Sequence, residues 1–311
     1  MTFQRKAVAV VGATASGKSA LAHQVALELA PQVEIICVDA MTVYREMNIG
    51  TAKPTLKERS EVTYHLVDVV NPDEEFTVAE FQRQARRVAT EIWSRGHAVL
   101  YVGGTGLYGR AIIDDFEIPG QYPEIRQSLE AEAEVNVEAL HAELVKKDPV
   151  AAAKMESNNA RRIIRALEVV RGSGKAFSSF GDEMSEYKQS RVCQVGLSST
   201  AEGSKSAVAE RFKTWLEEGL LEEVRALSAR PAGLSRTARQ AVGYRELLLH
   251  VEHGIPFDEC IEDALRASRQ LARRQRAWFR RDPRIEWFDN GESAKLRLIA
   301  LLQSDASLVR D

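Results

Sequence analysis

The amino-acid sequence predicts an α/β fold in which helices cover both faces of a parallel sheet. Short, continuously apolar runs indicate strands that are buried on both faces. Segments with helical periodicity separate these runs, and this alternation is typical of a parallel sheet with helical crossovers. The expected strands cover Ala7–Val11, Glu34–Val38 and Ala98–Val102, and the expected helices between them cover Lys18–Ala30 and Thr77–Arg95.

Local signals set the limits of these elements. The first strand ends at Gly12, and the first helix follows a glycine-rich turn. The helix beginning at Thr77 opens with a capping-box pattern, because Glu80 lies three residues after the threonine. The third strand is followed at once by the sequence Gly-Gly-Thr-Gly, and a further apolar run, Val192–Leu197, returns the chain to the sheet. We expect the remainder to form helices over Ser204–Ser228, Thr237–Glu252 and Asp258–Arg281, with a short strand over Ile285–Phe288.

The strand signal almost disappears between Pro119 and Arg191, which predicts a helical insertion within the α/β domain. The chain is therefore divided into three parts. Residues 1–118 form the first part of the core, residues 119–191 form the insertion, and residues 192–311 complete the core.

Composition excludes several classes of protein. The chain has 311 residues, of which 44% are apolar and 28% charged, as expected of a globular protein with about two domains. No apolar run is long enough for a transmembrane helix or a signal peptide, so we expect a cytoplasmic protein that does not enter a membrane. Three isolated cysteines predict neither disulfides nor a zinc site. The formal net charge of −3 argues against a protein that coats nucleic acid with its whole surface, but it permits a local basic patch.

The most specific short motif lies between the first strand and the first helix. The pattern G-x-x-x-x-G-K-[ST] is matched at every position by Gly12, Ala13, Thr14, Ala15, Ser16, Gly17, Lys18 and Ser19. Its glycines let successive backbone N–H groups point at phosphate oxygens, and the helix N-terminus adds a favourable dipole. Lys18 supplies positive charge, and the Ser19 hydroxyl can ligate Mg²⁺. The sequence therefore predicts a phosphate-binding loop on a P-loop NTPase-like sheet.

A phosphate-binding loop does not name the reaction. The guanine-reading pattern Asn-Lys-x-Asp is absent from the sequence, which argues against a switch GTPase. Hydrolytic ATPases usually carry an acidic residue at the end of an apolar strand, but the strand Ala98–Val102 ends in glycines. Asp39, at the end of the second strand, is the better candidate carboxylate, because the carboxyl ends of parallel strands meet at the edge that binds ligands. By position alone, an ordinary strand-end or capping aspartate is an equally good interpretation.

Three longer segments follow the phosphate-binding loop: Val38–Tyr44, Asn48–Pro54 and Val102–Tyr108. Together with the loop they resemble the bacterial tRNA dimethylallyltransferases, also called tRNA isopentenyltransferases. The sequences Gly-Thr-Ala-Lys-Pro and Gly-Gly-Thr-Gly-Leu-Tyr within them are much more specific than the loop motif. The resemblance extends over about Val8–Phe288 and includes Asp148-Pro149, Asn158–Val169, Arg211-Phe212, Glu222–Val224, Ala241–Arg245, Gln270–Gln275 and Trp278.

That family transfers a dimethylallyl group from dimethylallyl diphosphate to N6 of adenosine 37 in tRNA, beside the anticodon. The resemblance implies that residues 12–19 hold the diphosphate and its Mg²⁺. It implies that Arg211 stabilises the charge that develops on the leaving diphosphate, and that Thr105 lies by the reacting bond. Asp39 would accept the N6 proton as the amine attacks carbon. The expected partners are dimethylallyl diphosphate and the anticodon stem-loop of tRNA, and the expected enzyme is a monomer.

The resemblance also assigns contacts with tRNA. These fall on Asp39, Ala40, Met41 and Thr42, on Arg161, Arg162, Ile163, Ile164 and Arg165, and on Gln240, Ala241, Val242, Gly243, Tyr244 and Arg245. The sequence departs from the usual family pattern at Ala13, where proline is common, at Ala40 and Thr42, where serine and glutamine are common, and at Gln240, where arginine is common. These departures leave the expected base and phosphate ligands in place, so they concern the adenine and tRNA sides of the site.

An arginine stripe near the C-terminus points to RNA independently of the family. The segment Leu265–Arg284 holds eight arginines and one acidic residue, Asp282. At about 100° per residue, five of them fall within roughly 80° of one helix face. We define the arginine stripe as Arg266, Arg269, Arg273, Arg276 and Arg280. A solvated surface helix usually carries acidic partners four residues away, and their scarcity here favours a polyanionic ligand. We assign tRNA contacts to Arg269, Arg273 and Arg276.

Three alternatives to a tRNA prenyltransferase stay open. An adenylate isopentenyltransferase would use a free nucleotide, but a small acceptor does not require the helical insertion and the arginine stripe. A P-loop small-molecule kinase would not predict the Gly-Thr-Ala-Lys-Pro segment. A non-enzymatic RNA-binding protein would have no use for a phosphate-binding loop beside a strand-end carboxylate.

Overall fold

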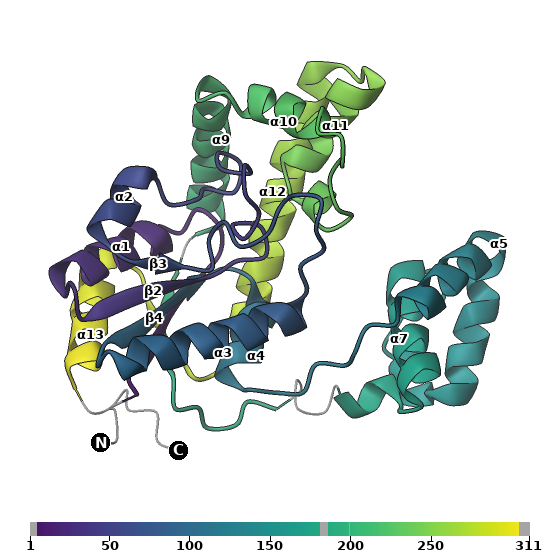
Figure 1. Ribbon diagram of the computed structural model, residues 1–311, viewed down its shortest axis with the longest axis horizontal. Coiled ribbons are helices and arrows are strands. Elements are labelled where there is room, and N and C mark those ends of the chain that lie inside the picture. The colour runs from purple at the N-terminus through teal and green to yellow at the C-terminus, as the bar shows by residue number, and fades with distance from the viewer. Residues whose placement is uncertain (1–4, 181–185, 199, 305–311) are drawn as a thin grey trace. The chain divides into compact units, whose positions relative to one another are not determined.

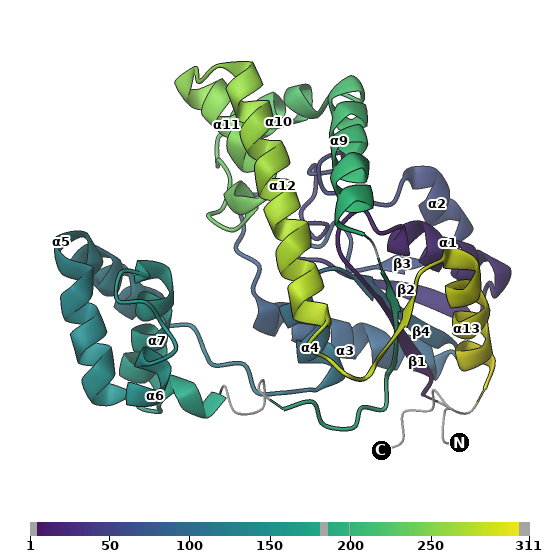
Figure 2. The same cartoon turned by 180° about the vertical axis from the view of Figure 1, so that it is seen from behind.

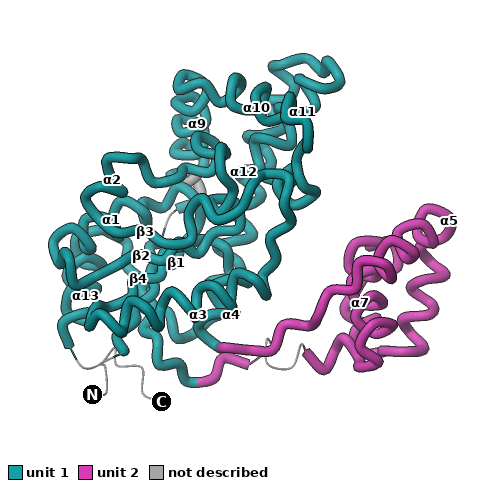
Figure 3. The backbone as a smooth tube through the Cα atoms, in the orientation of Figure 1, with its two compact units in different colours: residues 1–114, 189–311 teal, residues 115–188 magenta. Residues whose placement is uncertain are grey.

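The computed structural model describes residues 5–180, 186–198 and 200–304. The chain divides into two compact units, one of residues 1–114 and 189–311 and one of residues 115–188 (Figure 3). The sequence places the corresponding boundaries at residues 119 and 191, so the structural insertion begins four residues earlier and ends three residues earlier. Each unit has a hydrophobic core of its own.

The first unit is built on a six-stranded sheet in which every recorded strand pair is parallel (Figure 1). The α/β prediction is confirmed. In spatial order, the strands are β3 (Tyr64–His65), β2 (Val33–Val38), β4 (Ala98–Gly103), β1 (Ala7–Val11), β5 (Cys193–Leu197) and β6 (Ile285–Phe288). β3 was not expected from the sequence, because its two half-buried residues are defined only by pairing with β2.

Helices cover both faces of this sheet (Figures 1 and 2). Along β1, Val8 and Val10 belong to the core under α1 (Lys18–Glu28) and α13 (Gly291–Gln303). The alternate residues Ala7 and Ala9 belong to the core under α3 (Val78–Ser94) and α4 (Gly106–Ile113). This alternation of side chains is the two-residue period of a strand whose two faces are both buried. It explains why the strand sequences are continuously apolar.

The helix predicted from Thr77 begins as expected. The Thr77 hydroxyl accepts a hydrogen bond from the backbone N–H of Glu80 at 3.1 Å. The Glu80 carboxylate bonds the side chains of Arg83 and Gln84. The threonine therefore provides the expected cap, while the glutamate is engaged by its neighbours on the same helix.

Two helices expected to be continuous are interrupted. The segment expected as one helix over Ser204–Ser228 forms α9 (Ala201–Glu217) and α10 (Leu220–Ser228), separated at Gly219, whose φ of 99° is left-handed. The segment expected over Thr237–Glu252 forms a 3₁₀ turn, Ala238–Gln240, and then α11 (Tyr244–His253), with Gly243 at φ 94° between them. Left-handed backbone is readily available to glycine, so both glycines mark the breaks. The long helix α12 (Phe257–Phe279) and the short helix α2 (Leu56–Glu61) complete the helices of this unit.

The second unit is helical. It contains α5 (Pro123–Lys147), α6 (Pro149–Ala152), α7 (Ala160–Ser173) and a 3₁₀ turn over Phe177–Phe180. Asn136, with φ −161° and ψ 96°, breaks α5 into two helical stretches. The core of the unit includes Leu129, Leu140, Leu144 and Ile163. Within the described residues of the whole chain, none of the helices combines the length and the apolar character that crossing a bilayer requires.

Candidate active site

A cavity of about 220 Å³ opens over the carboxyl end of β4. β4 lies between β1 and β2, and Gly103 is in register with Val11 on one side and Val38 on the other. A Cβ atom at Gly103 would lie 2.0 Å from the carbonyl oxygen of Val38, and one at Gly104 would lie 2.8 Å from Nε2 of Gln275. Only glycine fits at position 103, because the blocking atom belongs to the backbone, whereas a side chain at position 104 would displace Gln275.

The phosphate-binding loop forms one side of this cavity. Gly17 has a left-handed φ of 86° and directly precedes α1, whose N-terminus has no side-chain cap. The uncapped N–H groups at a helix start are a favourable site for an anion. Gln275 of α12 fixes the loop, because its Oε1 accepts a hydrogen bond from the backbone N–H of Thr14 at 2.7 Å. Ser16 Oγ is buried and has no partner among the described residues, which leaves a hydroxyl donor for a bound phosphate oxygen.

Two basic side chains meet at the loop. Lys18 Nζ donates to the carbonyl of Ala13 at 3.2 Å, and Arg211 of α9 donates from Nη1 to the Thr14 hydroxyl at 3.1 Å. Burial lowers the pKa of Lys18 to about 8; the nearby Asp39 carboxylate opposes this shift and the Arg211 charge adds to it. Burial also lowers the pKa of Arg211, whose guanidinium lies 5.8 Å from the ring centre of Trp215. Desolvated cations without a bound anion are costly, so this side of the cavity favours an anionic ligand.

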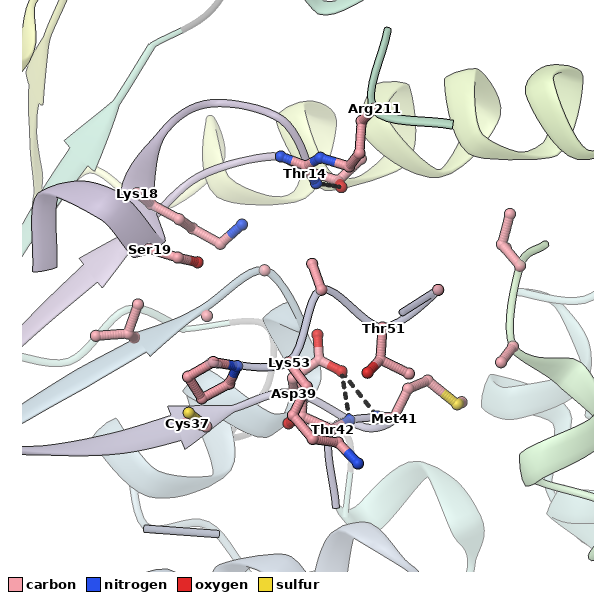
Figure 4. Close-up of a pocket in the computed structure, with 18 of the residues that line it drawn as sticks. Thr14, Lys18, Ser19, Cys37, Asp39, Met41, Thr42, Thr51, Lys53 and Arg211 are labelled. Carbon is pink, nitrogen blue, oxygen red and sulfur yellow. Dashed lines mark hydrogen bonds between the residues drawn. The ribbon is translucent and has the colours of Figure 1, made fainter. Parts of the chain in front are cut away.

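Asp39 lies on the opposite side of the cavity from Lys18 and Ser19 (Figure 4). Its Oδ1 accepts hydrogen bonds from the backbone N–H groups of Met41 at 2.7 Å and Thr42 at 3.3 Å. These bonds form a turn directly after β2 and fix the carboxylate. The second oxygen, Oδ2, has no recorded partner among the described residues, so it is available to a ligand. Asp39 thus caps the turn after β2 through Oδ1, as an ordinary strand-end aspartate does, and it also lines the cavity.

The Gly-Thr-Ala-Lys-Pro segment forms another wall. Gly50, Thr51, Ala52, Lys53 and Pro54 all line the cavity. The Lys53 ammonium is turned into the protein: it donates to the Tyr44 carbonyl at 2.6 Å, to Asn48 Oδ1 at 2.9 Å and to Asp68 at 2.7 Å, and its side chain is 1% exposed. Burial lowers the pKa of Lys53, against the opposing effect of Asp68. Lys53 therefore shapes the loop from within and is not a free cation of the site.

Comparisons with known proteins identify the family. A family model described as IPP transferase matches residues 42–282, well over half of the chain. The chain belongs to the IPP transferase family.

Two curated relatives and two solved structures extend this finding. The tRNA dimethylallyltransferase of Salinispora arenicola is 44% identical over 287 residues, covering 92% of this chain and 83% of the relative. That of Carboxydothermus hydrogenoformans is 42% identical over 310 residues, covering 98% and 99%. The full-length tRNA isopentenylpyrophosphate transferase of Bacillus halodurans is 34% identical over 97% of both chains, with a TM-score of 0.69. A eukaryotic dimethylallyltransferase described as acting on tRNA is 26% identical over 91% of this chain and 73% of that chain, with a TM-score of 0.72.

These likenesses confirm the predicted family and the P-loop-like fold. The curated relatives are named as dimethylallyltransferases, and the chain is an enzyme of the prenyltransferase class. In this IPP transferase, the cavity is lined by five of the eleven residues that the sequence predicts at the reaction centre. Of the expected catalytic and diphosphate-binding residues, it is lined by Asp39, Arg211, Thr14, Lys18 and Ser19.

Thr105 lines a different space from the other expected catalytic residues. It precedes α4 and lines a small apolar space with Val11 and Phe279, but it is not among the residues that line the cavity over β4. Its hydroxyl makes no capping hydrogen bond to α4. The expected role of Thr105 by the reacting bond stays a prediction, and its neighbour Gly104 lines the cavity.

The segments expected to contact tRNA are only partly accessible. Met41, Thr42, Ala241 and Val242 line the cavity. In the second unit, Arg161 and Arg162 are exposed, whereas Ile163 and Ile164 are buried in its core. For these isoleucines, a direct side-chain contact with tRNA does not fit the structure, since their spacing on α7 turns them inward.

Two further residues of these segments have structural partners. Arg165 donates to the carbonyls of Pro119 and Gly120 at 2.8 and 3.0 Å, so it fixes the start of the insertion. The Tyr244 side chain is fully buried and cannot touch RNA in this conformation. Of the remaining residues of its segment, Gln240 and Arg245 are exposed, although Arg245 forms an ion pair with Glu246.

The arginine stripe lies along α12. Arg269, Arg273 and Arg280 are exposed, and no ion pair is recorded for them among the described residues. Arg266 was expected to lack an acidic partner, but it forms an ion pair with Asp263. This aspartate lies just before Leu265–Arg284, the segment whose acidic residues were counted in the sequence. The buried face of the helix includes Ala264, Ser268, Ala272 and Phe279. α12 thus packs one face on the core and presents basic side chains on another.

Sequence reasoning assigned no role to several residues of the cavity. Gln275, Ser268 and Leu271 reach it from α12, and Trp215 reaches it from α9. Gln275 and Leu271 belong to a segment that resembles the family, but its pattern gave no indication that a glutamine would bond a loop 261 residues away. Cys37 lines the cavity as a buried thiol, and burial raises its pKa to about 12, which keeps it protonated.

Proposed function

We propose that this protein transfers a dimethylallyl group from dimethylallyl diphosphate to N6 of adenosine 37 in tRNA, as a cytoplasmic monomer. The products are diphosphate and N6-(dimethylallyl)adenosine. The observation that carries the proposal is a single cavity in which Lys18 and Arg211 meet at the phosphate-binding loop and Asp39 lies on the other side (Figure 4). This arrangement separates a site for an anionic leaving group from a carboxylate that can take a proton.

The diphosphate binds at the phosphate-binding loop in this proposal. The uncapped N-terminus of α1, the Lys18 ammonium and the Thr14–Arg211 pair would bind the leaving group. As the bond between the allylic carbon and oxygen breaks, negative charge grows on the diphosphate. Preorganised donors and cations stabilise that charge more strongly than the charge of the bound substrate, and a single such donor is typically worth about 10²–10³-fold in rate.

Mg²⁺ fits the oxygen donors of the cavity. The Ser19 hydroxyl and the Asp39 carboxylate both line it, and hard oxygen ligands suit this ion. The described residues contain no cluster of three or more His, Cys, Asp and Glu side chains that would form an all-protein site, so the remaining ligands would come from diphosphate oxygens and water. When bound, Mg²⁺ supplies charge that neutralises the diphosphate. Ser19 is the residue that we assign to it.

Asp39 is the proton acceptor in this proposal. An exocyclic adenine amine is a poor nucleophile, whereas an allylic cation is a strong electrophile, so loss of diphosphate can lead. The two N–H bonds to Oδ1 orient the carboxylate, and Oδ2 takes the N6 proton as the carbon–nitrogen bond forms. A well-placed base contributes about 10²–10⁴-fold to rate.

The tRNA contacts that we propose are those the structure leaves accessible. Met41, Thr42 and Val242 line the acceptor side of the cavity. Arg161 and Arg162 lie on the surface of the insertion, and Arg269 and Arg273 lie on that of α12. Exposed arginines bind the phosphate backbone without sequence preference, so they would hold the anticodon stem-loop while the cavity selects the base.

One experiment separates this function from its alternatives. The protein is incubated with Mg²⁺ and labelled dimethylallyl diphosphate, together with either unmodified tRNA or AMP. The proposal expects labelled tRNA and no labelled nucleotide. Label in AMP alone would instead establish an adenylate isopentenyltransferase.

A further inference from the structure

Two side chains from distant parts of the chain hold the loop that walls the cavity. Glu223 of α10 accepts hydrogen bonds from the backbone N–H groups of Asn48 at 3.0 Å and Ile49 at 3.2 Å. The Tyr244 hydroxyl, at the start of α11, accepts one from the backbone N–H of Gly50 at 3.1 Å. Three consecutive amides of the loop are therefore bonded by two side chains that lie more than 170 residues further along the chain.

The two side chains are also bonded to each other. The Tyr244 hydroxyl donates to Glu223 Oε1 at 2.5 Å, so one hydroxyl serves as donor and acceptor at once. Burial, together with the neighbouring Glu223 carboxylate, raises the pKa of Tyr244, which keeps the hydroxyl protonated as this arrangement requires. The pair is therefore a single unit in which the loss of either group leaves the other incompletely bonded.

The Tyr244 ring fixes how closely the loop approaches. A Cβ atom at Gly50 would lie 2.5 Å from Cε2 of this ring and 3.0 Å from Cδ1 of Leu220. Glycine is therefore required at position 50 by close contact, although its backbone φ is not left-handed. The loop lies directly against the ring, and its next residues, Thr51 and Ala52, line the cavity.

Tyr244 also connects this loop with a second part of the cavity lining. Ala241 and Val242, just before it in the chain, line the same cavity. Gly243, with its left-handed φ of 94°, turns the chain so that Tyr244 enters the core. One buried tyrosine thus connects two stretches of chain, residues 50–52 and residues 241–242, that line the same cavity.

We propose that Glu223 and Tyr244 are positioning residues, which set the acceptor side of the cavity by holding the loop of residues 48–52 against α10 and α11. This inference rests on the proposed function, because the acceptor that they position is the adenine of tRNA. The pair touches neither substrate. It acts through the loop, so that the acceptor nitrogen reaches Asp39 and the allylic carbon together. A displacement of about 1 Å in such a wall can cost about 10²-fold in rate.

The test uses Tyr244→Phe, which removes the hydroxyl and keeps the ring, and Glu223→Gln, which presents an amide donor to the loop amides. Glu222→Gln is the matched control, because Glu222 is the neighbouring carboxylate on α10 and is exposed, with an ion pair to Arg225. In Tyr244→Phe and in Glu223→Gln we expect kcat/KM for tRNA to fall about 10–100-fold. The KM for dimethylallyl diphosphate and the affinity for inorganic diphosphate should stay within about twofold, because the phosphate-binding loop is unchanged. The control should match the unmodified protein.

Two further readouts keep the proposal distinct from a general loss of stability. Amide hydrogen exchange at residues 48–50 should accelerate in both variants, and the double variant should lose less activity than the product of the two single losses, because both act through one loop. If one variant does not fold, the other decides the matter. An unchanged kcat/KM for tRNA in a folded variant would overturn the proposal. An equal fall in kcat/KM for tRNA and in the affinity for inorganic diphosphate would overturn it as well. If the unmodified protein does not prenylate tRNA at all, it is the proposed function that fails.

Discussion

Replacing Asp39 by asparagine tests the assignment of the base most sharply. The Oδ1 atom that accepts the Met41 and Thr42 N–H bonds can be kept by the asparagine carbonyl, so the turn after β2 should persist. The substitution removes only the proton-accepting Oδ2. We expect kcat to fall about 10²–10⁴-fold, which corresponds to about 2.7–5.4 kcal/mol of lost transition-state stabilisation.

A second effect of this substitution determines the assay conditions. The Asp39 charge raises the pKa of Lys18 against the effect of burial, so its loss should lower that pKa further below about 8. A smaller fraction of Lys18 would then be charged at a given pH, and diphosphate binding would weaken for a reason unrelated to the base. Single-turnover rates should therefore be measured with both substrates saturating at about pH 6, where protonation of Lys18 is favoured. Asp73→Asn, which removes an exposed carboxylate paired with Arg230, is the control.

The refuting result is a rate within a few-fold of the unmodified protein under these conditions. Such a rate would show that Asp39 is not the base and that another acceptor, such as water, takes the N6 proton. A large loss of tRNA affinity with an unchanged single-turnover rate would assign Asp39 to binding instead.

Three further predictions concern the rest of the cavity and the surface. Lys18→Ala should raise the KM for dimethylallyl diphosphate. In the unmodified protein, the same KM should rise as pH increases through about 8, because the anion binds the protonated lysine more tightly. Steady-state kinetics measured across this pH range checks both expectations. Replacing Arg269, Arg273 and Arg276 by Gln should weaken tRNA binding and reduce the slope of log affinity against log salt by about 0.7–0.9 per lost phosphate contact, with little change in turnover at saturating tRNA; equal slopes in a folded variant would contradict it. Lys53→Met should lower the free energy of unfolding by about 1–3 kcal/mol, measured by urea denaturation, because it leaves buried acceptors unpaired.

The sheet was predictable because its signals are local. Each central strand is a continuously apolar run, since both of its faces are covered, and the glycines after β1 and β4 are visible in the sequence. β3 could not be found in this way. Tyr64 and His65 form a strand only because β2 offers Ile35 and Ile36 as partners, and two residues carry no periodicity. The breaks at Gly219 and Gly243 were overlooked because a single glycine within an amphipathic pattern does not by itself end a helix.

Some residues of the candidate site could likewise be predicted from local sequence, whereas others could not. Lys18, Ser19 and Asp39 follow directly from motif and strand end, because the chain itself places them at the sheet edge. Arg211 was assigned through the family resemblance, and the structure shows what the resemblance could not, namely its hydrogen bond to Thr14. The contacts of Glu223 and Gln275 join residues far apart in sequence, and no local pattern reports such a pairing. Long-range polar contacts are therefore the part of the site that only the structure supplies.

The most direct test of the central claim is the position of the label in the tRNA product. Two unmodified anticodon stem-loops are compared, one with adenosine at position 37 and one with guanosine, each with Mg²⁺ and labelled dimethylallyl diphosphate. The proposed function predicts label in the adenosine substrate alone, carried on N6 after nucleoside digestion and mass spectrometry, with release of one diphosphate for each group transferred. Equal labelling of both stem-loops, or label on any atom other than N6 of adenosine 37, would contradict the proposed function.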